Sequence, residues 1–244
     1  PHRPALLVFT LGPEAEARRR RLLPQAFNAQ DLSLELEFHR ACLESTLVAG
    51  QEAGCELFVC SPDSIALPSF QAVHPSQEQD APTIVHLPQS DGSFGRRIEK
   101  AIADLRQQLG DERPILLVGT DAPELTAHHL LTALEALARE PATAAVGASR
   151  DGGFYLLAFR GPLDLAGIRW RGRSTRADLE GRLRRSGRRV VPLAPLGDLD
   201  RAADLESWLA RTRSRGNASS IACAFRTLIA ALAVNSLYGS DRSR

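Results

Sequence analysis

The residues best placed to do chemistry lie in the segment Pro114–Pro123, where an apolar run leads into Gly119-Thr120-Asp121. A short apolar run with β-branched ends, closed by Gly and Pro, predicts a buried parallel strand followed by a loop. Asp121 would then lie at the C-terminal edge of a central strand, where open α/β sheets bind their ligands. A carboxylate there can hold Mg²⁺ against a diphosphate, because Mg²⁺ prefers one or two carboxylates together with phosphate oxygens. The alternative is that Asp121 caps the next helix.

A second candidate is Asp151, which opens the sequence Asp151-Gly152-Gly153. Asp-Gly is among the strongest hairpin signals, so we expect a tight turn here. An aspartate in such a turn can act as a general base on an acceptor hydroxyl, or hold that hydroxyl in place. The alternative is a turn with no part in catalysis.

Strand-like and helix-like segments alternate along the chain. Apolar runs predict strands at Ala5–Phe9, Glu56–Cys60, Thr83–Leu87, Ile115–Gly119, Thr143–Ala148, Phe154–Phe159 and Arg189–Leu193. Helical spacing predicts helices at Leu32–Ala49, Gly95–Leu109, Thr126–Arg139, Thr175–Ser186 and Ala202–Arg213. This alternation implies an α/β fold with a mainly parallel sheet covered by helices on both faces. The Asp151 turn is too short for a crossover helix, so one strand beside it should be antiparallel and the sheet mixed.

The composition argues against several classes of protein. A net charge of +1 over 244 residues gives no reason to expect nucleic acid or an anionic membrane as a partner. No run is long and apolar enough for a transmembrane segment, and the strand-like start predicts no signal peptide and a cytoplasmic location. The four cysteines lack metal-ligand spacing. Two of them, Cys55 and Cys60, are expected to be buried thiols on opposite faces of one strand.

Four segments together resemble one bacterial family. They are QSDGSFGRRIEKA (Gln89–Ala101), VGTDAPELT (Val118–Thr126), DGGFYLLAFR (Asp151–Arg160), and Trp170 followed by Ser174-Thr175. In this order they resemble the motifs Q-x-G-x-D-L-G-x-R-M, G-[ST]-D-x-P-x-L, D-G-G-Y-Y-L-I-G and W-x-T-S. These motifs are typical of bacterial GT-A-like nucleotide-diphospho-sugar transferases or glycosyltransferases, some of which are associated with arsenosugar biosynthesis. The resemblance covers roughly Ala5 to Leu209 and implies a GT-A-like, Rossmann-like domain in residues 1–213. The tail departs from the family pattern, and its own residues predict a linker and an amphipathic helix in 214–244.

The resemblance also implies a phosphate-binding loop after the first strand. The family loop reads F-A-K-x-P-x-P-G-x-x-K-T-R-L-x-P, and its second Lys and its Arg align with Arg19 and Arg21. Leu11 stands in place of the first Lys and Glu16 in place of the Gly, while Glu14 adds a further negative charge. Because a phosphate loop favours glycine and cations, these departures are expected to weaken or alter donor binding. The alternative for the arginines is a solvated helix start.

Further nucleotide contacts follow from the same resemblance. Gln89 would pair with a base edge through its amide, and Gly95 would let the backbone approach the base closely. Thr120 would lie at the phosphates, and Asp121 would hold the metal ion. The alternative for the Gln89 segment is an ordinary loop before a helix.

Acceptor and metal contacts complete this assignment. Gly152, Gly153 and Trp170 would lie on the acceptor side. The segment Leu196–Glu206 resembles a D-x-D-T-P-E-D-L element, in which Asp200 would provide the second metal ligand. Asp200 is also expected to be the N-cap of the helix that follows.

The expected function is therefore a Mg²⁺- or Mn²⁺-dependent transferase with a nucleotide-diphospho-sugar donor and a small-molecule acceptor. Two alternatives stay open. One is a nucleotidyltransferase that joins an NTP to a phosphorylated metabolite and releases pyrophosphate. The other is a non-catalytic nucleotide-binding or assembly subunit, which the altered first loop and the apolar tail motivate. The tail carries apolar residues at helical spacing and should dock on the domain or on a second subunit as a homodimer contact; these residues are Ile221, Phe225, Leu228, Ile229 and Leu232.

Overall fold

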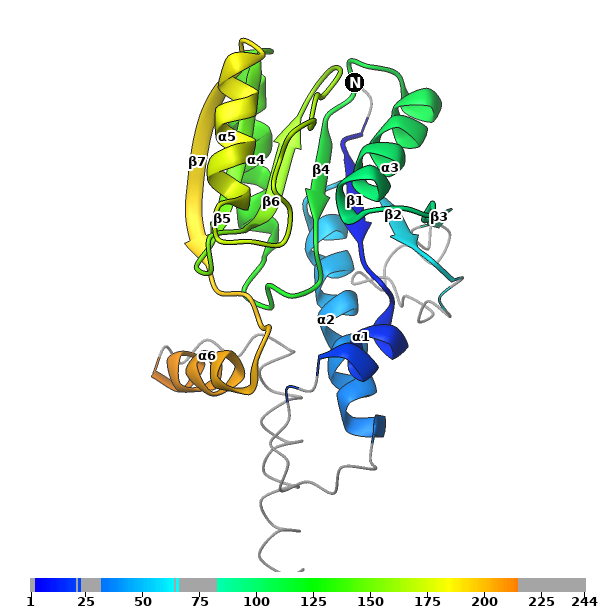
Figure 1. The fold of residues 1–244 in the computed structure, drawn as a ribbon, viewed down its shortest axis with the longest axis vertical. Helices are drawn as coiled ribbons and strands as arrows, with labels where there is room; N and C mark the ends of the chain where they lie inside the picture. Colours follow the sequence, from blue (N-terminus) through cyan, green and yellow to red (C-terminus); the bar gives the residue numbers. More distant parts are fainter. Residues whose placement is uncertain (1–2, 21, 23–31, 64, 66–82, 215–244) are drawn as a thin grey trace, which may run out of the picture.

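The computed structural model describes residues 3–20, 22, 32–63, 65 and 83–214 of the chain. These residues form one seven-stranded sheet with the order β3-β2-β1-β4-β6-β5-β7 (Figure 1). The strands are β1 (Ala5–Phe9), β2 (Glu56–Ser61), β3 (Ile84–Pro88), β4 (Ile115–Val118), β5 (Thr143–Ser149), β6 (Phe154–Phe159) and β7 (Arg189–Leu196). The helices are α1 (Pro13–Arg19), α2 (Leu32–Glu52), α3 (Phe94–Leu109), α4 (Ala127–Arg139), α5 (Thr175–Arg185) and α6 (Ala202–Ser214).

The sheet is mixed, as the sequence predicts. Strands β3, β2, β1 and β4 pair in parallel, and β5 pairs in parallel with β7. Strand β6 pairs antiparallel with both β4 and β5. The expectation of one antiparallel strand beside the Asp151 turn is therefore confirmed.

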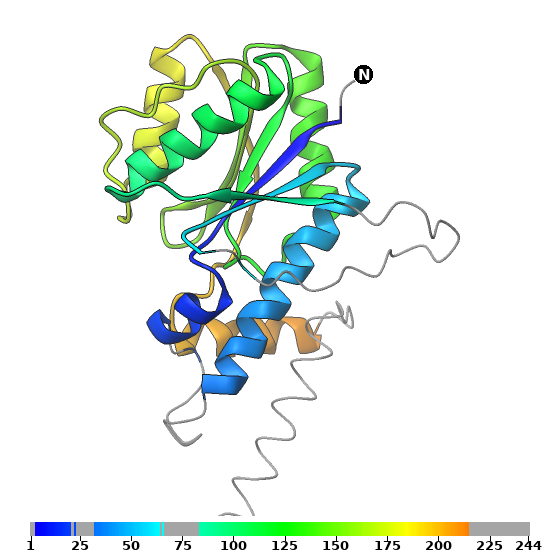
Figure 2. The ribbon, with the colours of Figure 1, turned by 90° about the vertical axis from the view of Figure 1, so that its right-hand side faces the viewer.

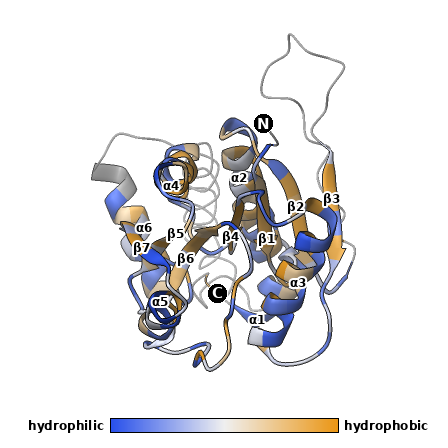
Figure 3. Cartoon of the chain, turned by 90° about the horizontal axis from the view of Figure 1, so that it is seen from above, coloured by the Kyte–Doolittle hydropathy of each residue, from blue (hydrophilic) through white to orange (hydrophobic). Residues whose placement is uncertain are grey.

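Helices cover both faces of the sheet, so the fold has three layers (Figure 3). Apolar residues of α2 and α4 pack on one face, and apolar residues of α3 and α5 pack on the other. Cys55 belongs to the first core and Cys60 to the second, and both are buried free thiols, as predicted. Cys223 lies outside the described residues. Strands β1, β2, β4, β5 and β6 are buried along most of their length, which explains why they are short continuous apolar runs, whereas the edge strands β3 and β7 are partly exposed.

A third and smaller core lies beyond the carboxyl edge of the sheet. Helix α2 extends past the strands at this end, close to α1 and α6 (Figures 1 and 2). Phe38 of α2 packs there with Leu205 and Trp208 of α6, and Trp208 is 1% exposed. This core fixes the segment between β7 and α6 against the rest of the domain, because Leu199 of that segment is also part of it.

The order of the strands creates a crevice at the same edge. From β1 the chain runs outward to β2 and β3, and it then returns to β4 on the other side of β1. Adjacent crossovers that leave in opposite directions open a crevice beyond the carboxyl ends of the two strands, and α/β proteins bind ligands there. The segments after β1 and β4 are therefore the structural basis of a candidate site.

The structure differs from the sequence prediction at two local points. The loop after β1 contains a seven-residue helix, α1, with proline at its start. Helix α6 begins at Ala202, so Asp200 is too early to be its N-cap. Instead the Asp204 carboxylate accepts the Arg201 N–H at 2.9 Å, which leaves the Asp200 side chain available for other contacts.

Two expectations concern the ends of the chain. No helix within the described ranges has the length and apolarity that a membrane crossing requires. The linker and the amphipathic helix predicted for 214–244 lie outside the described residues, apart from Ser214 at the end of α6. The homodimer contact assigned to that helix therefore stays a prediction.

Candidate active site

A cleft of about 520 Å³ opens at the carboxyl ends of β1 and β4. Residues from the loops after β1, β4, β5, β6 and β7 line it, and α1 and α3 contribute side chains. Seven of the residues assigned to the site from the sequence lie in this lining: Arg19, Thr120, Asp121, Asp151, Gly153, Trp170 and Asp200. The crevice expected from the strand order is thus a real cavity with polar walls.

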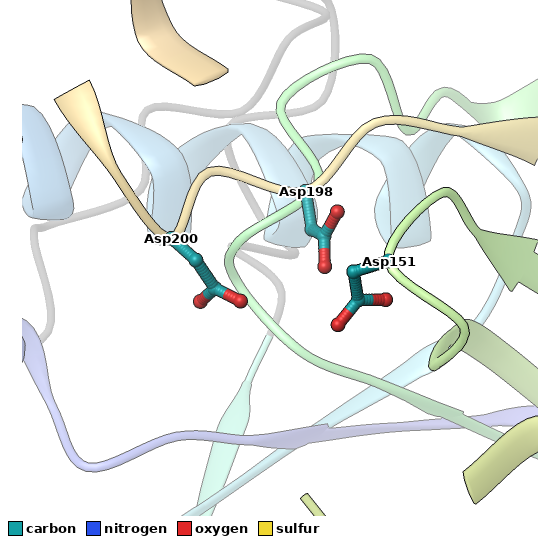
Figure 4. Close-up of side chains that lie close together, drawn as sticks. All are labelled: Asp151, Asp198 and Asp200. Carbon is teal, nitrogen blue, oxygen red and sulfur yellow. The ribbon is translucent and has the colours of Figure 1, made fainter. Parts of the chain in front are cut away.

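Three aspartates converge at one end of the cleft. Asp151 comes from the turn between β5 and β6, and Asp198 and Asp200 come from the segment between β7 and α6 (Figure 4). One carboxylate oxygen from each lies within 4.8 Å of the others. We call these three residues the acid cluster. Sequence reasoning missed Asp198, although its spacing of two from Asp200 places both side chains on the same side of an extended segment.

The turn holds Asp151 in an ionised form. Asp151 Oδ1 accepts the Ser149 hydroxyl and the Gly153 N–H, each at 2.7 Å. Burial alone would raise the pKa of Asp151, but these hydrogen bonds lower it below its usual value. The hairpin turn predicted from Asp-Gly therefore also orients the carboxylate.

Gly152 locks this turn to the Trp170 loop. Its φ is +99°, in a region that glycine adopts readily and residues with a Cβ rarely adopt. A Cβ at this position would lie 2.3 Å from the Arg173 carbonyl oxygen, and the Arg176 N–H donates to the Gly152 carbonyl at 3.1 Å. The two predicted acceptor-side segments consequently form one unit.

Asp198 lies beside other carboxylates, without a cationic partner among the described residues. Burial, and then the charge of Asp151, raise the pKa of Asp198 to about 7. Neither Asp151 nor Asp198 has an ion pair with a lysine or arginine in the part of the chain that the structure describes. The acid cluster thus favours any cation that reaches it.

Asp121 lies beside this cluster but is already paired. Arg20 Nη1 is 3.1 Å from Asp121 Oδ2 and 2.9 Å from Asp200 Oδ1. Arg20 Nε also pairs with Glu16 at 3.3 Å. Burial opposes the charged form of Arg20, but these three carboxylates raise its pKa above the ordinary value. The two aspartates predicted to share a metal ion therefore share a guanidinium in this structure.

Of the other predicted phosphate contacts, Arg19 and Thr120 line the cleft. Arg19 lines the cleft and is exposed, and Thr120 lies at its base, with its hydroxyl 3.5 Å from the Thr10 hydroxyl. Arg21 lies outside the described residues.

Gln89 and Gly95 have internal partners. The Gln89 amide donates to the Thr10 carbonyl at 2.7 Å and to the Cys60 carbonyl at 2.9 Å, and it accepts from Arg97 at 2.7 Å. A Cβ on Gly95 would lie 2.2 Å from Trp170 Nε1. The described contacts therefore tie β1, β2 and α3 together and seat the indole, while the assigned role in base recognition stays a prediction.

A second part of the cleft is aromatic and cationic. Trp170 makes an edge contact with Phe94 and a tilted contact with Phe154, at centroid distances of 5.7 Å and 6.3 Å. Arg97 and Arg171 both lie near the Phe94 ring, at 5.9 Å and 5.0 Å from its centroid. We call this part of the cleft the aromatic end.

A comparison with protein families decides the relationship of this chain. Residues 46–172, just over half of the chain, match a family model described as "Uncharacterized protein conserved in bacteria (DUF2064)". The chain belongs to the DUF2064 family. The matched segment of this DUF2064 chain includes Gln89, Asp121, Asp151 and Trp170. A comparison with curated proteins gave no match.

Solved structures share the fold of this DUF2064 chain. One is a "putative nucleotide-diphospho-sugar transferase" from Desulfovibrio desulfuricans G20, with a TM-score of 0.72 and 21% identity over 94% of this chain and 96% of that one. A 4-diphosphocytidyl-2C-methyl-D-erythritol synthase matches with a TM-score of 0.48 and 12% identity, covering 84% and 97%. A Mycobacterium tuberculosis H37Rv protein in complex with manganese matches with a TM-score of 0.43 and 17% identity, covering 85% and 98%.

The first of these structures confirms the resemblance seen in the sequence at the level of the fold. Its high coverage of both chains shows that the mixed sheet and its helices form the same architecture in both. The other two are too distant to bear on the site. The chemistry of this DUF2064 chain must therefore be argued from its own cleft.

Proposed function

We propose that this chain is a transferase that uses Mg²⁺ or Mn²⁺ to act on a nucleotide-diphospho-sugar and passes the glycosyl group to a small-molecule acceptor. One observation carries this proposal: the acid cluster lies in the same cleft as arginines and aromatic rings, at the crevice between β1 and β4. Carboxylates that can hold a divalent cation, cations that can contact phosphates and rings that can stack are the groups such a donor requires.

The acid cluster fits a divalent cation. Its donors are all carboxylate oxygens, which Mg²⁺ and Mn²⁺ prefer, and they are close enough to bind one ion. Burial, and then the charge of Asp151, raise the pKa of Asp198, so a bound cation would favour its ionised form. Asp198 and Asp200 would hold the ion with Asp151, and Asp121 would keep Arg20 in place beside it. A bound ion would neutralise charge on the leaving diphosphate.

The other groups of the cleft then have distinct tasks. Arg19 and Arg20 face the position of the diphosphate and stabilise the charge that develops on it. The Asp151 turn and the Trp170 loop position the acceptor hydroxyl opposite the donor. Asp151 keeps its carboxylate ionised through Ser149 and Gly153, so the oxygen that is not bound by the turn can accept a hydrogen bond from that hydroxyl.

The test is a thermal-shift screen of the whole chain with nucleoside diphosphates, nucleoside triphosphates and nucleotide sugars, each with Mg²⁺, Mn²⁺ or EDTA. A ligand at 100 times its Kd adds about 2.7 kcal/mol of stability. We expect a shift that requires metal, that Asp198→Asn abolishes and that Asp111→Asn preserves. Asp111 is the matched control because it is exposed and precedes β4, at the opposite edge of the sheet. No shift with any nucleotide would overturn the proposal.

The reaction products distinguish this proposal from its closest alternative. A glycosyltransferase releases a nucleoside diphosphate, whereas a nucleotidyltransferase that consumes an NTP releases pyrophosphate. Tight, metal-dependent nucleotide binding without either product over a broad panel of acceptors would instead support a non-catalytic binding subunit.

A further inference from the structure

The aromatic end of the cleft contains cations that the proposed donor chemistry does not use. Arg97 comes from α3, and Arg171 comes from the loop that carries Trp170. Their guanidinium groups lie near the same Phe94 ring, at 5.9 Å and 5.0 Å. An aromatic face stabilises one such cation, but it does not remove the repulsion between two of them.

Neither arginine has an ion pair among the described residues. Arg97 donates one hydrogen bond, to the neutral Gln89 amide at 2.7 Å, and its Nε is buried without an acceptor. Arg171 makes its ring contact and no described ion pair. The negative charge of Glu16 partly offsets the repulsion between Arg171 and the neighbouring arginines, but Glu16 is itself paired with Arg20 at 3.3 Å. The two cations are therefore available to an anion that enters the cleft.

The backbone at Arg171 supports the same conclusion. Its φ is +62°, and it is the one non-glycine residue with positive φ in the described ranges. Such a conformation is strained for a residue with a Cβ and persists where the surrounding structure imposes it, often at ligand sites. Glycine would adopt this conformation without strain. The presence of arginine here therefore indicates that its side chain has a role.

The position of Arg171 assigns the anion to the acceptor. The Trp170 loop is fixed to the Asp151 turn through Gly152, and Arg171 is part of that unit. Arg20 and its partners Asp121 and Asp200, which lie after α1, β4 and β7, are the groups that would face the diphosphate. The charges of Arg19 and Arg20 also act on Arg171, so this cation pair on the acceptor wall adjoins the groups assigned to the leaving group.

We propose that Arg97 and Arg171 form an anion-binding subsite for the acceptor, and that the acceptor carries a phosphate or carboxylate group next to the ring or chain that stacks on Trp170. The assignment of this site to the acceptor rests on the proposed function, but anion binding itself can be measured without metal or nucleotide. Arginine suits both anions because its planar donors match two oxygens at once.

The experiment is isothermal titration of the whole chain in EDTA with three probes: glucose 6-phosphate, glucuronate and glucose. We expect glucose 6-phosphate or glucuronate to bind and uncharged glucose not to bind. The comparison of the two charged probes distinguishes a phosphorylated acceptor from a carboxylated one. Binding of neither charged probe would overturn the inference.

Three variants locate the binding. Arg97→Gln and Arg171→Gly should each weaken the charged probe by about tenfold or more, because each removes a charge-assisted hydrogen bond. Arg173→Gln should have no effect, since Arg173 is exposed in the same loop and outside the cleft lining. Arg171→Gly should not lower the Tm, because glycine relieves the positive φ; an intact fold with unchanged probe affinity would overturn the inference.

The metal-dependent nucleotide screen separates this inference from the proposed function. A normal nucleotide shift without binding of the charged probes would leave the transferase standing and reject the acceptor subsite. Charged-probe binding without any nucleotide shift would do the reverse. If Arg171→Gly weakened the nucleotide and left the charged probe unchanged, the arginines would serve the donor and the acceptor assignment would be wrong.

Discussion

Two pairs of aspartates in one cleft differ in how their charge is balanced. Asp121 and Asp200 are bridged by Arg20 Nη1, at 3.1 Å and 2.9 Å. Asp151 and Asp198 face one another without a cation from the described residues, and burial with mutual repulsion raises the pKa of Asp198 to about 7. The first pair is stabilised by the chain itself, whereas the second gains most from a cation that is not part of the chain.

This difference changes the part that Asp121 plays. The family loop quoted above has Thr at the position of Arg20, between the positions aligned with Arg19 and Arg21. A guanidinium at that place can neutralise Asp121 without metal. The consequence is that a divalent cation is expected toward Asp198 rather than toward Asp121.

The largest effect is expected from breaking the first pair. Arg20→Gln leaves three carboxylates without their cation and should lower the free energy of unfolding by about 2 kcal/mol in EDTA. This loss of stability is at the low end of the range for breaking a buried ion pair, because the Asp121 and Asp200 side chains are 32% and 45% exposed. Urea denaturation measures it.

The same helix provides a control for Arg20→Gln. Arg18 pairs with Glu14 at 3.8 Å, but their side chains are 72% and 68% exposed to solvent. Arg18→Gln should change the stability by less than about 0.5 kcal/mol. Equal effects of the two substitutions would contradict a special role for Arg20, as would a failure of Mg²⁺ to restore part of the stability lost in Arg20→Gln.

A smaller effect of opposite sign is expected from the second pair. Asp198→Asn removes a carboxylate whose pKa in the fold, about 7, exceeds its reference value of 3.8. Ionisation of Asp198 therefore costs stability as the pH rises from about 4 to 7. In EDTA the variant should match the parent chain near pH 4 and be more stable by about 1 kcal/mol at pH 8. If the parent chain were the more stable of the two at pH 8, the hypothesis that the charge of Asp198 is unbalanced in the fold would be wrong.

An effect no larger than the last concerns the hydrogen bond that orients Asp151. Ser149→Ala removes the hydroxyl that donates to Asp151 Oδ1 at 2.7 Å and should cost about 1 kcal/mol at pH 7. Because this hydrogen bond lowers the pKa of Asp151, the cost should begin to fade below the reference value of 3.8 and disappear as the pH falls through the lowered pKa. A loss of stability that is the same at pH 3 and pH 7 would mean that packing, rather than the charge of Asp151, is responsible.

The elements that carry these groups are predictable because their determinants are local. The strand predictions Ala5–Phe9 and Phe154–Phe159 match the structure at both ends, and the other strands differ by one to three residues at an end. A four-residue apolar run closed by Gly-Thr-Asp is enough to place Asp121 at a strand end. The turn at Asp151 follows in the same way from Asp-Gly.

The missing parts of the site depend on contacts between distant segments. Arg20 and Asp121 are 101 residues apart, and nothing in the run Arg18–Arg21 says which arginine points inward. The structure answers this through the end of α1, where Arg20 has an extended backbone with φ −112° and leaves the helix axis. Gly95 is similar, because a close approach is recognisable from glycine while its partner, Trp170, lies far along the chain.

The single reversed strand has a consequence for how the chain acquires its fold. Strands β5 and β6 are joined by a four-residue turn, so their pairing closes a very short loop, whereas β1 must find β4 across more than a hundred residues. Short-range pairings lose little loop entropy and form faster than long-range ones. The hairpin that contains Asp151 is therefore expected to be among the earliest structures in folding. The parallel strands that bring Asp121 and Asp200 toward it would be assembled afterwards, around a carboxylate that is already in place.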